Sequence, residues 1–276
     1  MSGEQPVRAE EEPLELRVDG HVGHLTLNRP AKLNAIDSRM LELLDASIGE
    51  IEANPAVRSV LVQARGRAFC AGADLEHVMA SLASPGAFGA WLDEWHRVFR
   101  RVEHCSKPTV AVVQGMALAG GLELTQVFDV VVASDDARFG DQHAKLGLFP
   151  GGGSTQRLPR LVGRRQARWM LLSGETISAQ EGWQYGLVTR VVPAADAVGV
   201  GTELAVQLAQ LSTTASAAIK KAAIEGAELP LDSALLLERL LAVEHMASAD
   251  PQIGLEAFRA RATPVFTGYD LDDPQR

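Results

Sequence analysis

The sequence predicts an α/β protein with a mainly parallel sheet, followed by a helical segment at the C-terminal end. Between residues 14 and 193, apolar runs of strand length alternate with stretches of helical periodicity. After Pro193, helical patterns follow one another with no strand pattern between them. A helix that joins two strands usually brings them side by side in parallel, so the alternation predicts βαβ crossovers.

The chain begins with a predicted β-hairpin. Apolar and polar residues alternate over 14–18, Asp19-Gly20 supplies a turn, and residues 22–27 resume the extended pattern. A helix is expected over 37–53, because an Asp and a Ser that can cap it precede apolar residues at helical spacing.

Three further apolar runs, over 58–63, 109–113 and 127–133, predict buried strands. Helical stretches lie between them, notably over 87–103 and 121–126. The chain as a whole is therefore divided into a disordered acidic tail, a core and a helical C-terminal segment, with the boundaries 1–12, 13–195 and 196–276.

Composition excludes several classes of protein. The formal net charge of −9 argues against nucleic-acid binding, because no broad cationic surface is available. No apolar run approaches the roughly 20 residues that span a bilayer, and the polar N-terminus is no signal peptide. Two cysteines suit a reducing compartment, and no histidine has partners at metal-ligand spacing. We therefore expect a cytoplasmic protein without membrane contact or metal.

The first glycine loop, residues 66–75, directly follows the strand predicted over 58–63. Its small residues Ala71, Gly72 and Ala73 allow the backbone to approach a ligand closely. An N–H group at such a turn can point into a cavity. An ordinary glycine turn explains this segment equally well.

The second glycine loop, residues 114–124, follows the strand predicted over 109–113. Gly120 and Gly121 stand at the start of a helix, where unpaired N–H donors and the helix dipole favour a developing oxyanion. Glu123 lies three residues further on, within reach of the same cavity. The alternative is a first-turn acid facing solvent, which the apolar neighbours of Glu123 disfavour.

Together with three other segments, these loops resemble the crotonase (enoyl-CoA hydratase/isomerase) superfamily. The resemblance covers residues 14–195, and its motifs lie, in order, at 28–35, 66–75, 107–124, 150–158 and 179–188. It implies a crotonase-like fold, with a ββα-type spiral core and a helical C-terminal segment that serves in trimerisation or as an active-site cover. It also implies a homotrimer, or a hexamer built as a dimer of trimers.

The resemblance also assigns roles to residues. The oxyanion-hole amides fall on Ala73 and Gly120, and a catalytic carboxylate falls on Glu123. A pair of such donors can stabilise the developing charge on a thioester oxygen by about 3–4 kcal/mol each. Contacts to the coenzyme A part of the substrate are implied for Lys32, Leu33, Ala71, Asp74 and Leu75.

The sequence departs from the family at the second catalytic glutamate. Aligned between Phe139-Gly140 and Pro150-Gly151, this position holds His143. A histidine could deliver the proton, because both of its forms are accessible near neutral pH. Asp141 is a minor alternative, since it would share a face with His143 in an extended segment. His143 could also merely line the pocket.

Residues 76–95 correspond to the region that shapes the acyl pocket in the family. Trp91 and Trp95 could line a pocket for a large acyl group, but aromatic residues at helical spacing more often belong to a core.

The expected activity is reversible hydration of a 2-enoyl-CoA, with the coenzyme A thioester as substrate and no cofactor. Two alternatives stay open. The first is another reaction on the same enolate, either isomerisation or the hydrolytic ring cleavage of a cyclic oxoacyl-CoA. The second is a non-catalytic acyl-CoA binder.

Overall fold

A computed structural model describes residues 12–82 and 84–266. Residues 1–11 of the predicted acidic tail lie outside this part of the chain. The strands are β1 (Leu14–Asp19), β2 (Val22–Leu27), β3 (Ser59–Ala64), β4 (Thr109–Val113), β5 (Met116–Leu118), β6 (Val130–Ser134), β7 (Arg138–Gly140), β8 (Thr176–Ser178) and β9 (Arg190–Val192).

The helices predicted over 37–53, 87–103 and 121–126 are present with small differences in their bounds, and further helices accompany them. The helices of the described residues are η1 (Pro30–Lys32), α1 (Ser38–Ala53), α2 (Leu75–Ser81), α3 (Pro85–Glu103), α4 (Gly120–Thr125), η2 (His143–Leu146), α5 (Ser154–Val162), α6 (Arg164–Ser173), α7 (Ala179–Tyr185), α8 (Ala197–Ala209), α9 (Thr213–Gly226), α10 (Leu231–Met246) and α11 (Asp250–Ala260).

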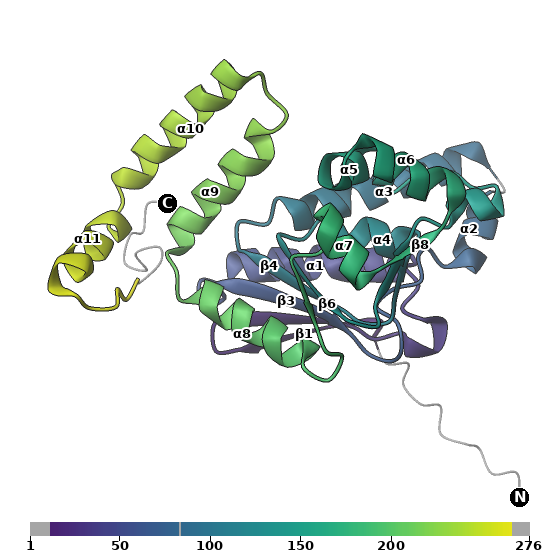
Figure 1. Ribbon diagram of the computed structural model, residues 1–276, viewed down its shortest axis with the longest axis horizontal. Helices are drawn as coiled ribbons and strands as arrows, with labels where there is room; N and C mark the ends of the chain where they lie inside the picture. The colour runs from purple at the N-terminus through teal and green to yellow at the C-terminus, as the bar shows by residue number, and fades with distance from the viewer. Residues whose placement is uncertain (1–11, 83, 267–276) are drawn as a thin grey trace, which may run out of the picture.

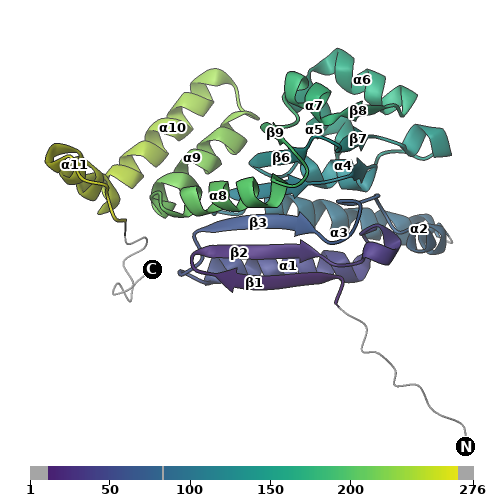
Figure 2. The same cartoon turned by 60° about the horizontal axis from the view of Figure 1, so that its bottom comes forward.

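Within the described residues, the main sheet has six strands in the order β1–β2–β3–β4–β6–β9. The hairpin strands β1 and β2 are antiparallel, and the other neighbours are all parallel. Figures 1 and 2 show this sheet with helices on both of its faces. The predicted α/β class and mainly parallel sheet are confirmed.

Alternation along β4 divides the core between the two faces of the sheet. Val110 and Val112 pack in a cluster with α8, whereas Ala111 and Val113 belong to the large cluster on the other face, which includes α1 and α3. Successive side chains of a strand point to opposite faces, so a strand buried on both sides is apolar throughout. This explains why β4 is recognised as an uninterrupted apolar run.

A smaller sheet has the strand order β5–β7–β8, and its strand β5 lies within the second glycine loop. One prediction needs correction here. The strand expected over 127–133 begins at Val130, and Val127 and Phe128 are instead buried core residues between the end of α4 and β6. These two residues are apolar because they are buried, and their apolar side chains extended the run from which the strand was predicted.

The helices of the C-terminal region are confirmed, and they fall into two groups. Helix α8 packs on the main sheet, whereas α9, α10 and α11 project away from it (Figure 1). Helices α9 and α10 lie against each other, yet neither contains a fully buried residue. The boundary at residue 195 stays a prediction. In the part of the chain that the structure describes, no helix is long and apolar enough to cross a membrane.

Candidate active site

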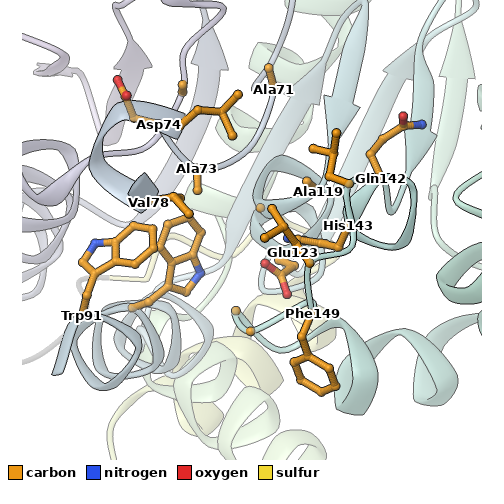
Figure 3. A pocket seen from close by; sticks show the side chains of 18 of the residues that line it. Ala71, Ala73, Asp74, Val78, Trp91, Ala119, Glu123, Gln142, His143 and Phe149 are labelled. Atoms are coloured by element: carbon orange, nitrogen blue, oxygen red, sulfur yellow. The ribbon is translucent and has the colours of Figure 1, made fainter. Parts of the chain in front are cut away.

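A cavity of about 640 Å³ lies where the two glycine loops meet helices α2 and α3 and the segment 142–152. Ala73, Gly120, Glu123 and His143 all line it. In Figure 3, Glu123 and His143 lie on one wall and Trp91 lies on the opposite wall, with Ala73 between them. The structure thus brings the four main predicted site residues to one pocket.

The two predicted oxyanion amides lie close together. The N atom of Ala73 is 3.2 Å from the position that a Cβ on Gly120 would take, and the N atom of Gly120 is 3.2 Å from the corresponding position on Gly72. Within the described residues, neither amide donates to a backbone carbonyl outside its own element, and Gly120 opens α4, so its N–H has no partner in that helix. Both N–H groups are available to an oxygen atom in the pocket.

Hydrogen bonds between the two loops hold these amides in place. Cys70 donates from its N–H to Met116, and its carbonyl accepts from the N–H of Leu118. Gly121 is required by this contact, because a Cβ there would lie 2.1 Å from the carbonyl oxygen of Cys70. The small residues noticed in the sequence therefore serve close packing of one loop on the other.

Glu123 is a buried carboxyl group on α4, with only 2% of its surface exposed. Its Oε1 accepts a hydrogen bond of 3.1 Å from the N–H of Ser154 at the start of α5, which leaves Oε2 for other partners. Burial raises the pKa of Glu123 to about 7, although the charge of His143 and the Ser154 bond act in the opposite direction. A carboxyl group with such a pKa can accept and return a proton near neutral pH.

His143 begins the short helix η2, and its ring is held from behind by Asp141. The two side chains share a 2.8 Å hydrogen bond between Nδ1 of His143 and Oδ1 of Asp141. Because a carboxylate oxygen can only accept, Nδ1 carries the hydrogen and Nε2 is the free ring nitrogen. Burial lowers the pKa of His143, but the bond to Asp141 and the charges of Asp141 and Glu123 outweigh it, so this pKa lies above its ordinary value.

Asp141 itself is fully buried and does not line the cavity. The expectation that it shares a face with His143 in an extended segment is wrong, because the chain turns at Gln142 and enters η2. Asp141 contacts the histidine from behind and is no substitute carboxylate facing the substrate.

Aromatic and aliphatic side chains of α2 and α3 form an apolar wall, which lies across the cavity from Glu123 at Trp91 and comes close to Glu123 at Trp95. Trp91 and Trp95 pack edge to face, with ring centroids 5.3 Å apart, and Phe88 packs against Trp91. Both tryptophans belong to the main core cluster and line the cavity as well. The interpretation as core residues is confirmed, and the role in shaping an acyl pocket stays a prediction that their place in the cavity wall supports.

Most of the predicted coenzyme A contacts line the same cavity. Lys32, Ala71, Asp74 and Leu75 all border it, whereas Leu33 does not. The carbonyl of Leu33 accepts from the N–H of Ala71, so this residue supports the first loop from behind. Their roles in binding stay predictions.

Other residues of the site were not foreseen from the sequence. Arg29 donates to Asp74 at 2.9 Å and thereby fixes the start of α2. Gly152 borders Glu123, and Phe149 extends the cavity toward its mouth. Gly152 and Phe149 lie in or beside the glycine turn of the motif at 150–158, so this motif could have indicated them as site residues. In the described residues, no cluster of three or more His, Cys, Asp or Glu could hold a metal ion.

Comparisons with known proteins agree with this geometry. The family model described as enoyl-CoA hydratase/isomerase matches residues 17–269. The chain is 37% identical over 244 residues to the 2,3-dehydroadipyl-CoA hydratase of Escherichia coli, covering 88% of this chain and 94% of the relative. It is 35% identical over 244 residues to the short-chain-enoyl-CoA hydratase of Clostridium acetobutylicum, covering 88% and 93%.

Among solved structures, an enoyl-CoA hydratase from Bacillus anthracis superposes with a TM-score of 0.88 at 30% identity, covering 92% of this chain and 99% of the other. The matched residues include both glycine loops, Glu123 and the C-terminal helices. The chain therefore belongs to the enoyl-CoA hydratase/isomerase (crotonase) family.

Proposed function

We propose that this protein binds acyl-CoA thioesters and catalyses the reversible hydration of a 2-enoyl-CoA. One observation carries the proposal: the N–H groups of Ala73 and Gly120 and the buried carboxyl of Glu123 face one apolar cavity. Two aligned N–H donors suit the thioester oxygen, on which negative charge develops when a nucleophile adds to the conjugated double bond.

In the proposed reaction, Glu123 in its ionised form takes a proton from water as the water oxygen bonds to the β-carbon. The π electrons of the double bond move to form an enolate, whose oxygen accepts hydrogen bonds from Ala73 and Gly120. The α-carbon then takes a proton from His143, and the thioester carbonyl re-forms. Glu123 afterwards releases its proton and His143 regains one, which restores both groups. One water molecule is added in total.

His143 fits the role of proton donor because Asp141 keeps its Nδ1–H bond and stabilises the protonated ring. The side chains of Glu123 and His143 lie on the same wall of the cavity (Figure 3). This arrangement also suits a shift of the double bond, in which one group removes a proton and the other returns it. Isomerisation is therefore the second candidate reaction.

We further propose that the protein works in the cytoplasm as a homotrimer, or as a hexamer made of two trimers. The support is a set of exposed apolar side chains on α9–α11, which a neighbouring copy would cover. These residues are Ile219, Leu231, Leu235, Leu236, Leu240, Val243, Met246, Leu255 and Phe258. Light scattering coupled to size-exclusion chromatography would report the mass, and a monomer at micromolar concentration would contradict the proposal.

The activity is tested with a panel of 2-enoyl-CoA thioesters of increasing chain length, by the loss of the absorbance of the conjugated thioester. Mass spectrometry of the product then separates the two candidates, because hydration adds one water and isomerisation leaves the mass unchanged. A protein that binds saturated acyl-CoA but converts no member of the panel would refute the proposal and favour a non-catalytic binder.

A further inference from the structure

Trp95 is an unusual member of the pocket wall. Its side chain is almost completely buried, with 2% exposed, yet its indole N–H has no hydrogen-bond partner among the described residues. A buried donor without a partner calls for an explanation, such as a water molecule or a group of a bound molecule that accepts from it. Trp95 also lines the cavity, so the partner can be a group of the substrate or a water molecule.

The position of the indole is fixed on two sides. Its six-membered ring packs on Gly120, where a Cβ would lie 2.8 Å from Cζ2 and 2.9 Å from Cη2. One residue further along α3, His96 contacts the carbonyl of Gly151 at 2.6 Å, which holds the helix against the glycine turn. The ring therefore lies beside the oxyanion amide of Gly120 and cannot turn away freely.

The indole nitrogen lies beside the catalytic carboxyl group. The position that a Cβ on Gly152 would take serves as a common reference point. It lies 2.3 Å from Nε1 of Trp95 and 2.4 Å from Oε2 of Glu123. No direct hydrogen bond joins the two side chains in the described structure. The Oε1 atom of Glu123 is already bonded to Ser154, so the oxygen next to the indole is the one available for chemistry.

Nε1 of Trp95 and Oε2 of Glu123 therefore lie no more than about 4.7 Å apart, a separation at which a donor and an acceptor can share one water molecule or hydroxyl group. Such an oxygen can donate one hydrogen to Oε2 of Glu123 and accept one from the indole N–H. A neutral indole cannot take the proton itself, so it directs the water without competing with the base. His143 is engaged by Asp141 and is assigned to the α-carbon.

We propose that the indole N–H of Trp95 holds the nucleophilic water, which becomes the β-hydroxyl oxygen of the product, against Glu123. The proposal rests on the hydration reaction proposed above. The new O–C bond forms at the oxygen that Trp95 holds, and the proton of that water goes to Glu123. In the reverse direction, Trp95 binds the β-hydroxyl of a 3-hydroxyacyl-CoA and stabilises it as it leaves.

Trp91 offers a matched control. It lies one helical turn earlier on the same helix, is buried, and also has an indole N–H without a partner among the described residues. In Figure 3 it lies across the cavity from Glu123. A general loss of aromatic packing would thus affect Trp91→Phe and Trp95→Phe alike, whereas loss of the hydroxyl contact would affect Trp95→Phe alone.

The first test measures affinities for 3-hydroxyhexanoyl-CoA and for hexanoyl-CoA, which lacks the hydroxyl. Trp95→Phe should lower the preference for the hydroxylated ligand roughly tenfold, the value of one lost hydrogen bond, and should lower kcat for hydration by a similar factor with little change in KM. Trp91→Phe should weaken both ligands together and leave their ratio unchanged. An unchanged ratio in Trp95→Phe would overturn the proposal.

The second test needs no turnover and no substitution at Trp95. In protein labelled with ¹⁵N-tryptophan, Trp91→Phe identifies one indole signal and a soluble paramagnetic agent identifies the exposed Trp169 and Trp183, so the remaining signal belongs to Trp95. That signal should move downfield with 3-hydroxyhexanoyl-CoA and much less with hexanoyl-CoA.

The two tests separate this proposal from the proposed function. If the protein hydrates enoyl-CoA and the Trp95 signal responds equally to both ligands, the role of Trp95 is refuted and the activity stands. If no enoyl-CoA is hydrated but the signal responds to the hydroxyl, the contact is supported and the activity is refuted. Equal responses without hydration would refute both.

Discussion

The two walls of the cavity contrast in how they are built and in what a substitution should do to them. The wall of α4 and residues 141–152 carries buried polar groups, and Glu123 and His143 are held there by Ser154 and Asp141. The wall of α2 and α3 is apolar and forms part of the main core. Burying a polar group on folding costs free energy, but such a group can take part in proton transfer. Burying an apolar group stabilises the fold. Substitutions on the first wall should therefore impair catalysis, and those on the second, apart from the indole N–H proposed for Trp95, should impair stability.

The largest expected effect is on the polar wall. Glu123→Gln keeps the acceptor for the N–H of Ser154 but removes the base, so kcat for hydration should fall by about 10²–10⁴-fold. Stopped-flow or steady-state absorbance with the best enoyl-CoA measures this. The affinity for saturated acyl-CoA is the control, because binding needs no base. It should stay within about threefold of the wild-type value. A variant with unaltered kcat would remove Glu123 from the mechanism.

The apolar wall should respond in the opposite way. Trp91→Ala removes a buried ring that packs on Phe88 and Trp95, and we expect a loss of about 3 kcal/mol in the free energy of unfolding. Urea unfolding followed by circular dichroism measures it. Trp183→Ala, on the half-exposed surface of α7, is the control and should change stability by less than about 0.5 kcal/mol. Equal losses in the two variants would mean that the wall contributes no core packing.

The raised pKa of Glu123 links the polar wall to stability. The ordinary carboxyl pKa is 4.5 and that in the folded protein is about 7, so the folded state holds this proton over a range in which the unfolded state loses it. The contribution of Glu123 to the free energy of unfolding is fully present below the ordinary pKa. It is lost as pH rises through 7, by up to about 3 kcal/mol. Glu123→Gln lacks the effect.

This dependence is measured as the difference in unfolding free energy between wild type and Glu123→Gln. The difference should shift in favour of the variant between pH 5 and pH 8, because other titrating groups are common to both proteins. A difference that is independent of pH would show that the carboxyl is not desolvated in the folded state, and the contrast between the two walls would lose its physical basis.

The features of the two walls that could be predicted from the sequence depend on residues close together in the chain. Those that could not depend on contacts between distant segments. The two glycine loops were recognised because small residues beside a strand end are local signals of close backbone approach, whereas the roles of Ala73, Gly120 and Glu123 came from the resemblance to the family. The hairpin and the apolar strand β4 were also recognised from local signals, because their patterns depend on nearby residues. The family and the order of its motifs were likewise visible in the chain.

Features that depend on packing between distant segments were not predictable. The indole of Trp95 meets Glu123 through the contact between α3 and the glycine turn, more than 50 residues apart in the chain. The turn at Gln142 that places Asp141 behind His143 is set by η2, and the sequence suggested an extended segment there. Leu33 was assigned to the substrate by its place in a motif, although its backbone supports the loop.

On the polar wall, the smallest effect we expect is that of Asp141→Asn, which tests how this wall holds its histidine. The amide can still accept from Nδ1, but its negative charge is gone, so the pKa of His143 should fall and less of the ring should carry the proton at neutral pH. We expect kcat to fall roughly 10–100-fold, as for a lost orienting carboxylate, with little change in KM.

The pH profile distinguishes this role from a structural one. Because protonated His143 is the proposed acid, activity is lost as pH rises through its pKa, and the alkaline limb of kcat should move to lower pH in Asp141→Asn. Asp93→Asn, an exposed carboxylate on α3, should leave that limb in place. If Asp141→Asn lowers activity equally at all pH values, Asp141 only supports the local fold, and His143 acts without its help.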